Sequence, residues 1–287
     1  MTGDRLILLT GGSGQVGRQV RRLLDEAKIA YLAPSRQDLS LDDLANIREY
    51  LERNTVNCIV HLAAETNVDL CELEPSLALL RNYESTKVLT DYAVTNNARM
   101  IFVSSAGVVS GDGAFLHDEN SVPTPANFYG ITKLHAENYI RTNATNYLIV
   151  RAAWMLGNSD KVKKFAEIIS DKLKNDEPVN AVFDKFGSLT SSLRLAELLV
   201  QAAASDFSGI VHCGSSTPCS RYDLAKEIAW RLGSKSSITP VPDSSFKLAA
   251  PRGFSEGLSS IVTPNAFKYE LLKWEDELSY YLGDVIK

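Results

Sequence analysis

The sequence is poor in cysteine and has no long apolar run. Its 287 residues include four cysteines, none of them in a C-x-x-C pair, which gives little support for disulfides or for a zinc site. No stretch approaches the ~18 apolar residues of a membrane span, and the first residues lack the pattern of a signal peptide. We therefore expect a cytoplasmic protein that needs neither a metal nor a membrane.

A block of basic residues is also missing. Thirty lysines and arginines against 35 aspartates and glutamates give a net charge of −5, which argues against nucleic acid as a partner. Apolar residues make up 45% and charged residues 23% of the chain, as in ordinary soluble globular proteins. A small-molecule ligand fits this composition best.

Short apolar runs alternate with longer amphipathic stretches. The strand-like runs are Leu6–Leu9, Ala30–Ala33, Cys58–Leu62, Met100–Val103 and Tyr147–Val150. The helical patterns are Gln15–Ala27, Leu44–Arg53, Ser76–Asn96 and Tyr129–Asn143. This alternation predicts an α/β fold with a doubly wound parallel sheet. We expect a dinucleotide-binding domain over residues 1–155. Residues 156–287 are expected to form mainly a smaller substrate-binding lobe, although some later segments can pack back into the first domain.

A glycine-rich loop follows the first strand-like run. Gly11, Gly14 and Gly17 have the spacing that permits a tight turn and a close approach of backbone N–H groups to a pyrophosphate at a helix N-terminus. A tight turn without a ligand is the alternative. The T-G-x-x-G-x-x-G form resembles that of the short-chain dehydrogenases/reductases, which have a Rossmann fold.

The choice of nicotinamide cofactor depends on the end of the second strand. There an acidic residue would bind the ribose 2′-hydroxyl of NAD and a basic residue the 2′-phosphate of NADP. Ser35 and Arg36 stand at this place, while Asp38 comes two residues later. The pattern predicts NADPH. NADH stays an alternative, because Arg36 is also explained as a solvated loop residue.

Tyrosine and lysine occur four residues apart at four places, so spacing alone has little value. The pairs are Tyr83/Lys87, Tyr129/Lys133, Tyr222/Lys226 and Tyr269/Lys273. Only Tyr129 follows a central strand that ends in a hydroxyl residue, Ser105, and opens its helix after a proline-bearing loop. We expect Ser105, Tyr129 and Lys133 to meet beside a nicotinamide.

Reduction of a ketone explains why these three residue types would be needed together. Hydride addition creates an alkoxide that must receive a proton, and a tyrosine can donate it. A nearby lysine ammonium would lower the pKa of the phenol from ~10. Ser105 would hydrogen-bond the carbonyl oxygen, and Lys133 would also hold the nicotinamide ribose.

These motifs resemble the extended short-chain dehydrogenases/reductases, and within them the dTDP-4-dehydrorhamnose reductase family, nearly from end to end. The segments that carry the resemblance are His61–Pro75, Asn82, Asn127–Glu137, Arg151–Trp154, Asp184–Thr190 and Arg252. The resemblance implies an NADP(H)-dependent reductase of a 4-keto-6-deoxy sugar nucleotide. A homodimer is one assembly compatible with it.

The resemblance also implies roles for single residues. It implies catalysis by Ser105, Tyr129 and Lys133, and substrate contacts at Ser105, Tyr129, Val68, Trp154 and Arg252. Beside the glycine loop, Ser35, Arg36 and Lys133, the expected cofactor contacts are Gln15, Val16, Ser40, Leu41, Ala63, Ala64, Glu65, Thr66, Asn82 and Val103.

Two departures from the family pattern affect the expected substrate. Ala106 and Gly107 stand where the family has aspartate and tyrosine, so we expect a wider and less polar pocket on one side. This predicts weak activity on dTDP-4-dehydrorhamnose and better activity on a related sugar nucleotide. Two alternatives stay open: an epimerase or dehydratase that retains its nicotinamide, and a non-catalytic subunit like the regulatory subunit of methionine adenosyltransferase.

Other polar residues have structural explanations. His61 and His212 lie in apolar runs and are expected in the core, whereas His117 and His135 are expected on a loop and on a helix surface. The acidic pairs Asp42-Asp43 and Asp118-Glu119 are expected at helix starts or in solvent.

Overall fold

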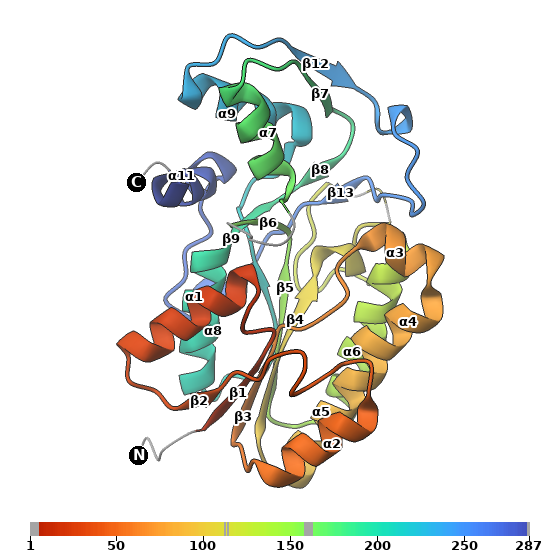
Figure 1. Cartoon of the computed structure of the whole chain (residues 1–287), viewed down its shortest axis with the longest axis vertical. Helices are drawn as coiled ribbons and strands as arrows, with labels where there is room; N and C mark the ends of the chain where they lie inside the picture. Colours follow the sequence, from red (N-terminus) through yellow and green to blue (C-terminus); the bar gives the residue numbers. More distant parts are fainter. Residues whose placement is uncertain (1–5, 112, 114, 158–162, 286–287) are drawn as a thin grey trace.

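The computed structural model describes residues 6–111, 113, 115–157 and 163–285, and a six-stranded parallel sheet forms its centre (Figure 1). The strand order is β10-β5-β4-β3-β1-β2. The strands are β1 (Ile7–Thr10), β2 (Tyr31–Leu32), β3 (Cys58–His61), β4 (Arg99–Ser105), β5 (Tyr147–Ala152) and β10 (Gly209–Cys213). The predicted doubly wound parallel sheet is confirmed, and the strands from β1 to β5 each overlap one of the five apolar runs.

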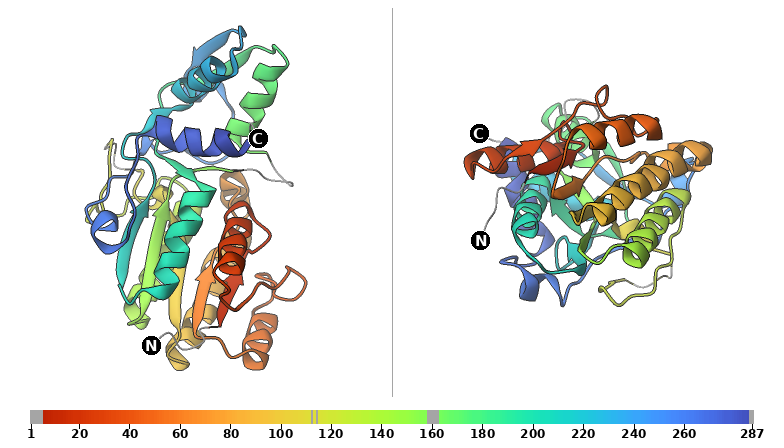
Figure 2. Two further views of the ribbon diagram at one scale, coloured as in Figure 1. Left: turned by 90° about the vertical axis from the view of Figure 1, so that its left-hand side faces the viewer. Right: turned by 90° about the horizontal axis from the view of Figure 1, so that it is seen from below.

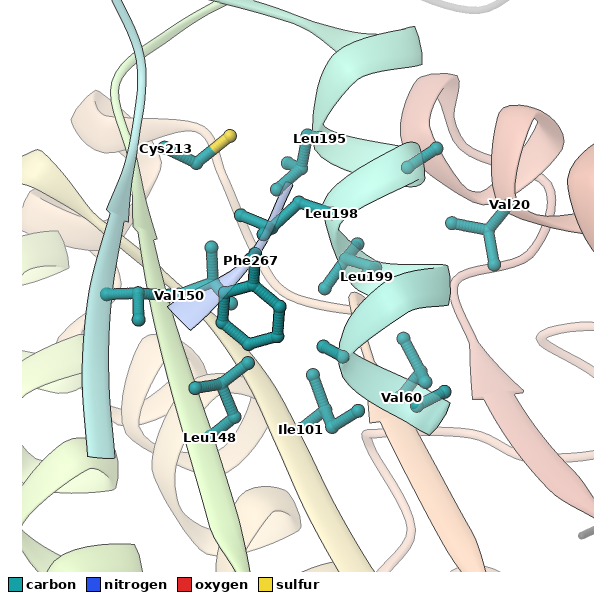
Figure 3. Packing of buried hydrophobic residues seen from close by; sticks show 14 of the residues in the cluster. Val20, Val60, Ile101, Leu148, Val150, Leu195, Leu198, Leu199, Cys213 and Phe267 are labelled. Carbon is teal, nitrogen blue, oxygen red and sulfur yellow. The ribbon is translucent and has the colours of Figure 1, made fainter. Parts of the chain in front are cut away.

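Alternate strand residues point to opposite faces of the sheet and form two cores. On β1, Ile7 and Leu9 contribute to one core and Leu8 to the other. The helices over the first core are α1 (Gln15–Glu26) and α8 (Ser192–Ala204), and those over the second are α2 (Leu44–Arg53), α5 (Ser85–Thr95) and α6 (Phe128–Asn143). Figure 3 shows Leu195 and Leu198 of α8 against the strand residues of the first core. Burial on both faces explains why the central strands are apolar throughout.

A smaller lobe stands on the carboxyl end of the sheet (Figures 1 and 2). Its helices and paired strands are α7 (Phe165–Lys174), α9 (Arg221–Leu232), α11 (Trp274–Val285), β7 (Val179–Val182) and β12 (Ile238–Val241). Short strands join it to the main sheet: β6 (Trp154–Leu156) with β9 (Leu189–Ser191), and β8 (Phe186–Gly187) with β11 (Cys219–Ser220) and β13 (Ser255–Glu256). The chain leaves the sheet after β5 and returns for α8 and β10, and the division at residue 155 stays a prediction.

The helix expected at Ser76–Asn96 is interrupted. It consists of α4 (Pro75–Leu79), the π-helical turn η1 (Leu80–Glu84) and α5. A π turn shifts the helical register and often marks a functional position. Here it contains Asn82, which is buried. A continuous helical pattern in the sequence gives no sign of this one-turn change.

Two expectations about polar residues are wrong. His117 is buried, because its backbone forms a bridge with Leu258. Glu119 is not a solvated charge, because its carboxylate accepts hydrogen bonds from the Ser260 hydroxyl and the Ile261 backbone N–H. Asp43 does start a helix, since it accepts the backbone N–H groups of the first turn of α2. Among the described residues, no helix has the length and apolar character needed to cross a membrane.

Candidate active site

The glycine loop has the geometry of an anion-binding turn. Gly11 has a φ of +71°, and its carbonyl accepts the Gly14 N–H at 3.0 Å. A β-carbon on Gly17 would lie 2.2 Å from the Gly11 oxygen, and one on Gly11 would lie 2.8 Å from the Ala63 nitrogen. Helix α1 begins directly after Gly14 without a side-chain cap. Its first N–H groups are therefore available to a negatively charged group.

Gln15 supplies an observation that favours a bound cofactor. Its Nε2 is buried and, among the described residues, has no hydrogen-bond partner. It lines a cavity of about 590 Å³ that also contacts Arg18, Gly157 and Ser192. A buried amide donor without a partner is costly. The glycine cradle and this amide fit a dinucleotide whose pyrophosphate lies at the start of α1.

The loop after β2 holds a chain of charges. Arg36 pairs with Asp42 at 3.1 Å, and its side chain is 71% exposed. Arg81 binds the same carboxylate and reaches Glu65 at 2.9 Å. The Arg81 hydrogen bond is the main reason why the pKa of Asp42 is lowered. The exposed Arg36 guanidinium is accessible to a phosphate, but binding the phosphate would break its ion pair with Asp42.

Ser35 and Asp38 form a turn of their own in the same loop. The Ser35 backbone N–H and hydroxyl donate to the Asp38 carboxylate at 3.0 and 2.7 Å. These bonds lower the pKa of the exposed Asp38 carboxyl. Further along, the Ser40 N–H donates to Asn46 at 2.9 Å, and Leu41 packs against the second core.

The segment after β3 is held by Asn82. The Asn82 side chain accepts the Glu65 N–H at 2.7 Å and donates to the Glu65 carbonyl at 3.0 Å, and it also donates to Thr132 of α6 at 3.1 Å. The π turn thus fixes the backbone of the expected cofactor contacts to the helix that carries Tyr129. Ala63 donates its N–H to Thr10 Oγ1 at 3.2 Å, and Thr66 is exposed.

Ser105 and Tyr129 meet at the carboxyl end of β4, and Lys133 lies one helical turn after Tyr129, over the Phe102 ring of the same strand. Asn127 caps α6 by accepting the Gly130 N–H at 3.0 Å. A β-carbon on Gly130 would lie 2.5 Å from the Gly107 carbonyl oxygen, so the start of α6 sits against the strand end. Ser105 hydrogen-bonds the Tyr129 side chain. Lys133 is 3% exposed, and its Nζ lies 4.1 Å from the centroid of the Phe102 ring.

The pKa values of this trio differ from the expectation. Burial raises the pKa of Tyr129 well above its usual range, and a hydrogen bond from Ser105 offsets only part of the shift. Burial lowers the pKa of Lys133 to about 7. The expected lowering of the Tyr129 pKa is therefore wrong for the chain without ligands, because desolvation of the buried phenol is the largest effect on it. Tyr129 is a protonated phenol at neutral pH, the form that donates a proton.

The expected substrate residues come from three other segments of the chain, β6, α3 (Val68–Leu73) and the stretch before β13. Trp154 opens β6, and its ring covers Gly187, where a β-carbon would come within 2.4 Å of the ring. Arg252 pairs with Asp69 at 2.9 Å and donates to the Ala250 carbonyl. Val68 starts α3 and is half-buried.

A carboxylate lies beside Gly107, on the side where the sequence predicts a less polar pocket than in the family. A β-carbon on Gly107 would lie 3.3 Å from Ser105 Oγ, 3.8 Å from Glu256 Oε1 and 3.9 Å from the Tyr129 ring. A carboxylate from β13 thus approaches the place that the family tyrosine would use. Sequence reasoning missed Glu256 because it belongs to an irregular Pro/Ser/Gly-rich passage, and no motif marks it.

Sequence reasoning also missed Arg221. Its guanidinium carbon lies 3.6 Å from the centroid of the Trp154 ring.

The Tyr222/Lys226 pair belongs to α9 in the smaller lobe, and Lys226 Nζ lies over the ring of Tyr222. The histidine predictions hold for His61 and His212, which are buried, and for His135, which is exposed.

A family model described as the RmlD substrate binding domain matches residues 5–286. The chain belongs to this family. The structure of dTDP-4-dehydrorhamnose reductase from Yersinia enterocolitica is 36% identical, covers 97% of this chain and 99% of that chain, and has a TM-score of 0.93. The Bacillus anthracis enzyme of the same name, solved in complex with NADP, is 24% identical over 98% of this chain and 100% of that chain, with a TM-score of 0.90. At that identity the likeness shows the fold alone.

A relative with a different name is also similar to the chain. Methionine adenosyltransferase 2 subunit beta from Xenopus laevis is 28% identical over 84% of this chain and 76% of that protein. Proteins similar to this chain thus carry different names. The choice among them depends on the residues of the site.

Proposed function

We propose that this protein is an NADP(H)-dependent reductase of a 4-keto-6-deoxy sugar nucleotide. The observation that supports the proposal is the hydrogen bond between Ser105 and Tyr129 at the end of β4, with Lys133 over Phe102 of the same strand, in a chain of the RmlD family. Tyr129 is protonated at neutral pH, because burial raises the pKa of its phenol. A protonated phenol beside Ser105 suits the reduction of a ketone.

NADPH, when bound, supplies a hydride to the ketone carbon. Tyr129 donates its phenolic proton to the oxygen that becomes an alkoxide. Ser105 hydrogen-bonds the same oxygen and orients it toward Tyr129. Lys133 would bind the nicotinamide ribose. Hydrogen bonds to the ribose hydroxyls would favour the ammonium form of this lysine, whose pKa burial lowers to about 7.

The preference for NADPH is assigned to Arg36. Its exposed guanidinium can form two parallel hydrogen bonds with a 2′-phosphate. Asp38 is engaged with Ser35 and is therefore less available for a 2′-hydroxyl. Gly11, Gly14, Gln15 and Val16 would hold the pyrophosphate at the start of α1.

The substrate would bind on the side of Trp154 and Arg252. Arg252 lies next to the main site and can exchange Asp69 for a diphosphate oxygen. The absence of an aromatic side chain at Gly107 favours weak activity on dTDP-4-dehydrorhamnose and better activity on a related 4-keto sugar nucleotide.

A substrate panel tests the proposal. The purified protein is mixed with NADPH and dTDP-, GDP- or UDP-linked 4-keto-6-deoxy sugars, and NADPH oxidation is followed by absorbance. Turnover of at least one sugar, with NADPH preferred over NADH, is the expected result. No oxidation with any sugar would refute a reductase of this class.

A non-catalytic regulatory subunit is a second candidate. The similarity to methionine adenosyltransferase 2 subunit beta favours it, and so does the loss of the family tyrosine at Gly107. This candidate predicts that the protein is recovered from cell extract together with a larger enzyme. An epimerase or dehydratase predicts instead that nicotinamide stays bound through purification.

A further inference from the structure

Glu256 enters the site from a strand that the sequence did not mark. It pairs with Gly187 in the short sheet of β13 and β8, so its neighbour is the glycine that the Trp154 ring covers. The Trp154 side chain donates a hydrogen bond to the Glu256 carboxylate. The hydrogen bond from the indole therefore orients the Glu256 carboxylate.

Two observations place the carboxylate within reach of the reacting group. Glu256 Oε1, Ser105 Oγ and the Tyr129 ring all lie within 4 Å of the point where a β-carbon on Gly107 would stand. As a residue, Glu256 is only partly buried. A sugar whose ketone oxygen contacts Ser105 and Tyr129 would place its neighbouring carbons next to Glu256.

The charges around Glu256 indicate what it can bind. The Arg221 guanidinium carbon lies 3.6 Å from the centroid of the Trp154 ring, and the charge of Arg221 stabilises the carboxylate; Arg252 adds to this effect. Burial opposes both arginines and raises the pKa of the Glu256 carboxyl. Two nearby cations disfavour an ammonium group on the ligand. A carboxylate has about four acceptor positions, so a neutral hydroxyl donor is the ligand group that fits.

We propose that Glu256 selects the sugar: its carboxylate accepts a hydrogen bond from the hydroxyl next to the reacting ketone, on carbon 3 of the ring. Arg221 and Trp154 are positioning residues that hold the carboxylate in place. The inference rests on the proposed reductase function. It explains how a chain without the family tyrosine keeps a polar contact on that side of the substrate.

The test compares two 4-keto-6-deoxy sugar nucleotides that share one nucleotide and differ only in the 3-hydroxyl. For the unmodified protein, kcat/KM should be about 10- to 150-fold higher with the 3-hydroxyl present, as expected for a hydrogen bond to a charged group. In Glu256→Ala the preference should fall to within about threefold, because activity on the 3-hydroxy sugar drops. Glu256→Gln keeps an acceptor and should lie in between.

Two controls separate recognition from folding. Glu49→Gln changes an exposed carboxylate that pairs with Arg53 on α2 and should leave the preference unchanged. Binding of NADPH and of dTDP should be the same in Glu256→Gln as in the unmodified protein. A purely structural role for Glu256 would lower activity on both sugars equally, and this result would overturn the inference.

Binding measurements distinguish this inference from the proposed reaction. Calorimetry with Tyr129→Phe, and with that variant also carrying Glu256→Ala, reports the affinity for both sugars without turnover. The two sugars could differ in affinity only when Glu256 is present, while the unmodified protein turns over neither. That result would refute the proposed reaction and support the role of Glu256 in sugar selection. Normal turnover with a preference that survives Glu256→Ala would refute the role of Glu256 and support the reaction. Failure to bind either sugar would refute both.

Discussion

The Glu256 carboxylate lies 3.8 Å from the point where a β-carbon on Gly107 would stand. The two residues are far apart in the sequence, yet they share one side of the candidate site. A larger residue at position 107 would compete with Glu256 for the same space, and this gives the first prediction.

Gly107→Tyr should lower kcat/KM at least tenfold for every sugar nucleotide that the protein reduces. A tyrosine ring built on that β-carbon would need space beside Glu256, whose Oε1 lies 3.8 Å from the β-carbon position, and displacement of groups near the reacting atoms costs much of the rate. Adding Glu256→Ala should recover activity on dTDP-4-dehydrorhamnose. Steady-state kinetics of the single and double variants measure both effects, and an unimpaired single variant would contradict this geometry.

Lys133→Met should stabilise the protein without ligands while it abolishes most of the activity. Burial lowers the pKa of Lys133 to about 7 from the usual 10.5. Between these pH values the unfolded chain binds more protons, so this lysine reduces stability at neutral pH and the loss disappears as the pH rises toward 10.5. The variant should melt several degrees higher at pH 7.

The pH dependence provides the control for Lys133. The gap in melting temperature between Lys133→Met and the unmodified protein should shrink at pH 9.5, where most of the penalty is gone. NADPH affinity of the variant should fall, because the ribose contact is lost. A gap that is constant with pH would show that the lysine is not desolvated as described.

Arg36→Ala should weaken NADPH binding and leave NADH binding unchanged. A guanidinium contact with a phosphate contributes about 1.5–3 kcal/mol, or roughly 10- to 150-fold in affinity. Fluorescence titration with both cofactors measures it. Arg53→Ala is the matched control, since Arg53 is similarly exposed and pairs with Glu49. Equal losses for both cofactors would argue against a 2′-phosphate contact.

Glu137→Ala should destabilise the fold by about 3–5 kcal/mol. Glu137 is fully buried and binds Arg151 at 3.0 and 2.7 Å and the Ser104 hydroxyl at 2.5 Å. Its loss leaves a buried arginine without its carboxylate partner. Denaturant unfolding measures the difference. Glu49→Ala, which breaks an exposed pair, should change stability by less than about 0.5 kcal/mol.

The sequence predicted the parts of the site that depend on local pattern. Gly11, Gly14 and Gly17 lie between a strand and a helix, where β-carbons on Gly11 and Gly17 would clash with neighbouring backbone atoms. The spacing of the glycines in the sequence is enough to predict this turn. Tyr129 and Lys133 share a helix face, so their proximity also follows from spacing. The same holds for the sheet, because strands buried on both faces are apolar runs.

The rest depends on contacts between distant segments. Glu256 and Arg221 reach Trp154 through short strands that have no periodic signal. The pKa of Tyr129 was misjudged for a similar reason, because desolvation depends on all surrounding elements and not on the lysine four residues away. The burial of His117 depends on a bridge to Leu258 that no local pattern indicates.

Replacement of one phenolic oxygen tests the central claim most directly. Tyr129→Phe removes the proton donor and leaves the shape of the site unchanged. With a sugar nucleotide that the protein reduces, kcat should fall by ~10²–10⁴, while the Kd for NADPH stays within about twofold and Tyr222→Phe in α9 has no effect. Turnover by Tyr129→Phe at the rate of the unmodified protein would contradict the account.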